Sequence, residues 1–158
     1  IFFKHQKQEG YLMEAINKKN IIAIEQSKNS MAKFAEEGIE KLRGLKGYNS
    51  DPALINPCRE TLFFFKQEAR MAQAYTDFFL KEENFSKLKK NFESRPASQR
   101  TQQDVDQFNN GVKEINAAVK DFNKTNDQLN KQRSAVYDAW NRAVKNYLDD
   151  HMPVQKKQ

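Results

Sequence analysis

The sequence predicts an all-α protein, an elongated antiparallel bundle of three long helices (up, down and up) with a short extra helical segment. Five Gly and four Pro in 158 residues leave few places for the frequent turns of a β protein. Apolar residues recur at three- and four-residue steps, as in amphipathic helices. Four asparagines recur every seven residues, each directly after an apolar residue, which indicates one long packed helix: Asn109, Asn116, Asn123 and Asn130.

A first helix is predicted over residues 11–46, where apolar side chains alternate with Lys and Glu. A turn follows, and Asp51 before Pro52 is typical of a helix start, so a second helix is predicted over 52–82. Pro57 is expected to kink this helix or to delay its start. The chain is long enough for one domain, with a single core as the default, so residues 1–158 are taken as one unit.

Residues 83–100 break the pattern and are predicted to form the second connection. Phe85 could belong to a short helical piece there, but Ser and Pro residues near 96 indicate a loop. Thr101 and Asp104 form a weak capping box for a last helix over 101–148, which would be ~70 Å long. A solvated tail is expected at 153–158. A four-helix bundle is the alternative if the last helix breaks near Lys124 to Asp127.

The seven-residue repeat places two polar side chains, Asn126 and Arg133, in the core row of the last helix. Burial of such groups requires hydrogen-bond or charge partners. On one interpretation they form a polar core layer: Asn126 fixes the helix register, and Arg133 either extends its charged end to solvent or pairs with a carboxylate from a facing helix, such as Glu68 or Asp77. A layer of that kind would tolerate Arg133→Leu. The other interpretation is a pocket for a small anion or a peptide end.

Two surface features are candidates for interactions with partners. The chain has a formal net charge of +6 and a pI near 9.3, and the excess is spread along its length. The one local concentration of cations includes Lys87, Lys89 and Lys90 beside Phe85, which suits a polyanion or a protein, although a solvated loop face explains it as well. The asparagine row is the second candidate, either as a polar flank bonding a neighbouring helix or as a recognition surface.

Several kinds of chemistry lack their sequence signatures. The chain has two His, one Cys and no Glu-x-x-His, His-Glu-x-x-His, Cys-x-x-Cys or Gly-rich phosphate loop. Cys58 therefore cannot form an intramolecular disulfide, and it is expected to be a small buried residue. No catalytic, cofactor-binding or metal-binding residue is predicted. Clustered phenylalanines at 63–65 and 78–79 leave self-association or a protein partner open.

No apolar run approaches the ~20 residues that span a bilayer. Because the chain opens at Ile1 without an initiator Met, membrane anchoring would require an upstream segment. The run from Asp51 to Phe79, followed by the Asn-rich helix with Trp140, Tyr147 and Pro153, resembles uncharacterised bacterial helical-bundle proteins, often exported or lipid-anchored. The resemblance implies a non-enzymatic envelope or surface protein rather than a cytoplasmic one.

The function predicted from the sequence is a non-enzymatic binding or structural module, acting through a protein or small-ligand interaction. The alternative is a polyanion- or nucleic-acid-binding protein that uses the basic stretch at 87–100. No helix-turn-helix or related motif accompanies that stretch, so nucleic acid is the less favoured partner.

Overall fold

The computed structural model describes residues 2–47 and 49–152, without the side chains of residues 2 and 3. Its α-helices are α1 (Phe2–Asn17), α2 (Ile21–Arg43), α3 (Ile55–Met71), α4 (Gln73–Glu93) and α5 (Gln102–His151), with a short 3-10 helix, η1 (Ala97–Gln99), before α5. The described residues contain no β-strand, so the predicted all-α helical bundle is confirmed.

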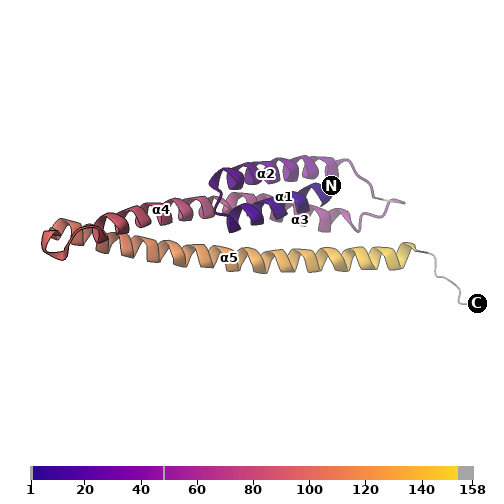
Figure 1. Cartoon of the computed structure of the whole chain (residues 1–158). Helices are drawn as coiled ribbons and strands as arrows, with labels where there is room; N and C mark the ends of the chain where they lie inside the picture. The colour runs from indigo at the N-terminus through magenta and orange to yellow at the C-terminus, as the bar shows by residue number, and fades with distance from the viewer. Residues whose placement is uncertain (1, 48, 153–158) are drawn as a thin grey trace, which may run out of the picture.

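The helices form an elongated molecule with two parts (Figure 1). Helices α3 and α4 follow each other almost in line and run antiparallel to α5, which passes along both of them. The α1–α2 hairpin packs beside α3. The chain therefore has a four-helix section, made of α1, α2, α3 and the C-terminal half of α5, and a two-helix arm, made of α4 and the N-terminal half of α5.

The predicted helix over 11–46 is wrong, because the structure has two antiparallel helices there, separated at residues 18–20. Lys19 adopts a left-handed backbone conformation with φ of 51°. The Asn20 side chain then accepts a hydrogen bond from the backbone N–H of Ala23 and caps α2. The turn contains no Gly or Pro. The hydrophobic periodicity therefore gave no sign of a break, and the predicted helix continued through these residues.

The predicted single helix over 52–82 is also wrong, because the structure divides it into α3 and α4 at Ala72, and two of its boundaries differ as well. Helix α3 begins at Ile55 instead of 52, with Pro57 in its first turn, so the expected delay is confirmed. Helix α4 continues to Glu93 instead of ending at 82, and the predicted connection at 83–100 shrinks to residues 94–101. The reason is packing, because Phe92 stacks on Phe108 of α5 with ring centroids 4.4 Å apart.

Helix α5 is unbroken over 50 residues and therefore ~75 Å long. Its predicted capping box is confirmed: the Thr101 hydroxyl accepts from the Asp104 N–H, and the Asp104 carboxylate accepts from the Thr101 N–H. The predicted alternative, a break near Lys124 to Asp127, is wrong. A four-helix section nevertheless exists, because the chain folds back at 18–20. The predicted tail at 153–158 lies outside the described residues.

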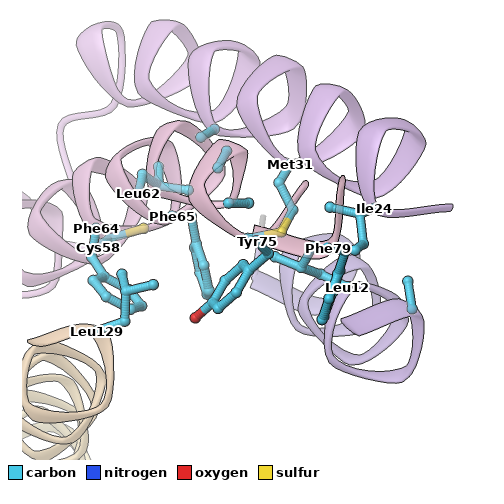
Figure 2. Close-up of a cluster of buried hydrophobic side chains, with 14 of the residues drawn as sticks. Leu12, Ile24, Met31, Cys58, Leu62, Phe64, Phe65, Tyr75, Phe79 and Leu129 are labelled. Carbon is cyan, nitrogen blue, oxygen red and sulfur yellow. The ribbon is translucent and has the colours of Figure 1, made fainter. Parts of the chain in front are cut away.

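One continuous hydrophobic core fills the four-helix section and reaches the beginning of the arm. Figure 2 shows side chains from all five α-helices pointing into it, including Leu12, Ile24, Leu62, Tyr75 and Leu129. No described helix combines the length and the apolar character required to cross a membrane.

The packing of the arm departs from the predicted repeat at one position of α5. Val119, in the predicted core row, is 40% exposed, whereas Ala118 is buried. Two turns earlier, a Cβ added to Gly111 would lie 2.5 Å from Cδ2 of Leu88 in α4. The absence of a side chain at Gly111 therefore lets α4 approach α5 closely.

Candidate functional site

Arg133 lies in a cluster of polar side chains that joins α1, α3 and α5. Its guanidinium pairs with the Glu68 carboxylate, and its Nε donates to Oε1 of Glu9 at 2.5 Å. Its Nη1 donates to the Asn130 side-chain carbonyl oxygen at 2.6 Å, and the Tyr137 hydroxyl donates to Oε2 of Glu9 at 2.7 Å. We call these five residues the Arg133 cluster. Of the two carboxylates that the sequence offered as examples of a partner, Glu68 is the one that pairs with Arg133. The protein's own carboxylates therefore bind the guanidinium that the pocket interpretation assigned to a ligand.

The cluster holds one positive charge between two carboxylates. The pKa of the fully buried Glu68 is raised to about 7: burial is the main cause, Arg133 opposes it, and the nearby Glu9 adds to it. Oε2 of Glu68 accepts no hydrogen bond from the residues that the structure describes. Burial also raises the pKa of the Tyr137 hydroxyl, which therefore stays protonated and donates. The cluster is thus arranged to take up one proton near neutral pH.

Asn126 does not belong to this cluster. Asn126 is an exposed residue. Its side-chain carbonyl oxygen accepts a hydrogen bond of 3.0 Å from the hydroxyl of the buried Tyr75. The prediction that Asn126 lies in the core is therefore wrong. The side chain instead completes a hydrogen bond at the core's edge, since a buried tyrosine hydroxyl needs a partner.

The asparagine row faces solvent: all four of its members are exposed. Asn130 bonds Arg133 within its own helix. The other three, Asn109, Asn116 and Asn123, make no side-chain hydrogen bond to another helix within the described parts of the chain. The interpretation as a polar flank bonding a neighbouring helix is therefore wrong, and recognition by this row stays a prediction.

The basic stretch at 87–100 is largely paired within the arm. Lys87 lies 2.6 Å from Glu83, and Lys89 lies 3.8 Å from Glu93. Arg95 pairs with Asp104 at 2.7 Å, and the Arg100 guanidinium lies 4.4 Å from the centroid of the Phe92 ring.

The aromatic side chains beside that stretch are directed into the arm. The Phe85 ring centroid lies 6.0 Å from that of Phe108 in α5, and both residues are half-buried. Lys90, in contrast, is exposed. The stretch therefore offers cations to a partner without the interleaved exposed aromatic rings that the sequence suggested.

An open pocket of 370 Å³ at the end of the four-helix section was missed by sequence reasoning. We call it the end pocket. It is bounded by the end of α2, the loop before α3, the first turns of α3 and the C-terminal part of α5. Its walls are mainly aliphatic and aromatic: Leu42, Leu45, Lys46, Gly47, Asp51, Leu54, Ile55, Cys58, Trp140 and Tyr147.

Local geometry in the loop before α3 shapes this pocket. Gly47 has φ of 81°, and a Cβ there would lie 1.8 Å from the Asp51 carbonyl oxygen, so only glycine fits. Oδ2 of Asp51 lies 2.7 Å from Nε2 of His151, which ties the loop to the end of α5. The His151 ring in turn contacts Tyr147, with centroids 4.3 Å apart. The loop and α5 are therefore joined beside the pocket.

The end pocket is suited to binding rather than to bond making. Burial raises the pKa of the Cys58 thiol, which keeps it neutral and weakly nucleophilic. The hydrogen bond with His151 lowers the pKa of the Asp51 carboxyl, and the hydrogen bond from the Ala53 N–H lowers it further, so Asp51 stays ionised. No group of three or more His, Cys, Asp and Glu able to hold a metal occurs among the described residues.

A second hollow, of 470 Å³, lies between α1 and α2. Amides and hydroxyls line much of it, together with the ion-paired Glu14 and Lys18. It is more polar than the end pocket, and Tyr11 is the aromatic residue in its lining. The sequence signal for the end pocket was the seven-residue step from Trp140 to Tyr147, which places both rings on one face of α5.

Comparison of the chain with protein-family models, with curated proteins and with solved structures gives no match. A proposal for the function therefore rests on the fold and on the geometry of the Arg133 cluster and the end pocket.

Proposed function

We propose that this chain is a non-enzymatic binding module and that its ligand, a small and largely apolar molecule, occupies the end pocket. The observation that carries the proposal is an open pocket of 370 Å³ with mainly aliphatic and aromatic walls, formed by three separate parts of the chain. Pockets of this size with apolar walls and a few polar groups are typical of small-molecule sites.

The state of the polar groups supports binding without catalysis. Cys58 is a neutral thiol, and no hydrogen bond pairs it with a base among the described residues. Asp51 is the one carboxylate in the lining, and it accepts hydrogen bonds from His151 and the Ala53 N–H. A nucleophile without a base is poorly suited to covalent catalysis.

Polyanion binding, the alternative from the sequence, receives less support. The arm pairs Lys87, Lys89 and Arg95 with neighbouring carboxylates, which reduces the positive charge offered to a partner. The proposal also keeps the setting that the resemblance implies, the periplasm or cell surface of a bacterium. Immunodetection in fractionated cells that produce the protein tests this setting.

The ligand site is tested with a neutral fluorescent probe, N-phenyl-1-naphthylamine, whose emission rises in an apolar environment. Wild-type protein is expected to give a saturable rise. Leu54→Phe, which fills the pocket from the beginning of α3, should remove most of it. Leu80→Phe is the matched control, because Leu80 is 45% exposed on α4 and does not line the pocket.

Circular dichroism establishes that both variants remain helical. A rise that is absent in the wild type, or one that Leu54→Phe and Leu80→Phe affect equally, would overturn the proposed site.

A further inference from the structure

The charges around the end pocket point to a more specific ligand. We propose that the ligand is a small amphiphile with a carboxylate, an inference that rests on the proposed function. Lys46 binds this carboxylate at the rim of the pocket, and the apolar body lies against Trp140 and Leu54. A medium-chain fatty acid is the simplest molecule of this chemical class.

The lining contains two charged side chains, and only one of them has its partners within the protein. Asp51 accepts from the Ala53 N–H at 2.8 Å and lies 2.7 Å from Nε2 of His151, so both of its oxygens are engaged. Lys46 is exposed and forms no ion pair with a carboxylate of the described residues. The unmatched charge at the rim is therefore positive, and it favours an anionic head group.

The rest of the lining favours an apolar body. Leu42 and Cys58 are almost completely buried, and the half-buried Trp140 contributes to the wall of the cavity. The neutral Cys58 thiol adds a soft apolar surface. An alkyl chain in this space would leave few polar groups unpaired, whereas a sugar or nucleotide would leave many.

The chain supplies its own reporters for the test. Trp140 is the single tryptophan and Cys58 the single cysteine, and both line the end pocket. Occupancy should change the Trp140 fluorescence and slow alkylation of Cys58 by iodoacetamide. The probes are decanoate, decan-1-ol and decyltrimethylammonium, all below their micellar or solubility limits. Each has a ten-carbon chain, and they differ in head-group charge.

Decanoate is expected to bind the wild-type protein about tenfold more tightly than decan-1-ol, and decyltrimethylammonium most weakly, as one charge-assisted hydrogen bond would produce. Lys46→Gln should weaken decanoate binding by about the same factor and leave decan-1-ol unchanged. Lys41→Gln is the matched control, since it removes an equal charge from an exposed position on α2 outside the pocket.

The outcomes separate the two proposals. Equal affinity for decanoate and decan-1-ol, or a Lys46→Gln variant that binds decanoate as the wild type does, overturns the carboxylate assignment and leaves the apolar site standing. If none of the three molecules changes Trp140 fluorescence or Cys58 alkylation, and N-phenyl-1-naphthylamine also fails to bind, both proposals are overturned. The head-group comparison in the wild type needs no variant to fold.

Discussion

Arg133 of α5 forms an ion pair with Glu68 of α3, and Glu9 of α1 accepts a hydrogen bond from the same guanidinium. One cation thus serves two carboxylates from two other helices. The Tyr137 hydroxyl adds a further hydrogen bond to Glu9, so α1 is held to α5 at two neighbouring positions of that helix. The docking of the N-terminal hairpin depends in part on this cluster.

Arg133→Leu should therefore destabilise the protein by about 3 kcal/mol at pH 8, because it leaves the buried Glu68 without its cation. The sequence alone predicted that a structural layer would tolerate this change, but that expectation did not include two dependent carboxylates. Urea unfolding followed by circular dichroism measures the difference. Glu68→Leu is the comparison, and it should cost less because Arg133 keeps Glu9. If Arg133→Leu has the same free energy of unfolding as the wild type, Arg133 does not stabilise the buried Glu68.

The stability of the protein should decrease as the pH rises through about 7. Burial raises the pKa of folded Glu68 to about 7 from an ordinary value of 4.5, so between these values the folded state holds a proton that the unfolded state has released. The contribution of Glu68 is fully present below pH 4.5 and is lost as the pH rises through 7. Thermal unfolding at pH 5, 6, 7 and 8 measures this dependence.

The control for the pH series is a pair of Glu→Gln variants. Glu68→Gln should flatten the decrease, because its amide does not titrate. Glu36→Gln, at an exposed carboxylate paired with Lys66, should leave the pH profile unchanged. Profiles of the wild type and Glu68→Gln that run parallel from pH 5 to 8 would show that Glu68 is not the titrating group.

Glycine-to-alanine changes should have opposite effects in the arm and in the four-helix section. Gly111→Ala places a Cβ 2.5 Å from Leu88 and 3.2 Å from Phe85, so overpacking should outweigh the gain in helix propensity and destabilise by about 1 kcal/mol. Gly10→Ala meets no atom within 4 Å and should stabilise by about 0.5–1 kcal/mol. Chemical denaturation compares the two. A stabilised Gly111→Ala variant would contradict the close approach of α4 and α5.

Heparin-agarose should retain the protein weakly and release it at low salt. Residues 81–104 contain six cationic and four acidic side chains, and three of the cations are paired with neighbouring carboxylates. Few phosphates or sulfates can therefore be neutralised, and the salt dependence should be shallow. Strong retention that a Lys89→Gln/Lys90→Gln double variant abolishes would instead favour the polyanion-binding alternative.

The parts of the fold that depend on local signals could be predicted from the sequence. The capping box at Thr101 and the seven-residue repeat located α5 to within a few residues, since both act along one helix. The turn at Lys19 was missed because a left-handed lysine is rare and has no sequence signature.

For the candidate sites, sequence reasoning found single residues but not the groups that they join. It named Glu68 as one of two example partners of Arg133, because a buried charge requires an opposite one, and the structure shows that Glu68 is the partner. It missed Glu9, which lay outside the predicted first helix. It also missed the end pocket, whose walls meet only after the loop carrying Gly47 and Asp51 brings α2 and α3 beside Trp140.

The continuity of α5 fixes a distance within the molecule. Trp140 follows Thr101 by 39 positions, so the turn at the tip of the arm lies ~60 Å from the end pocket along one unbroken helix. A partner held at the tip and a ligand held in the pocket could not touch each other. Any influence of one on the other would have to pass through the packing between helices, and α5 would act as the rigid spacer between two independent attachment points.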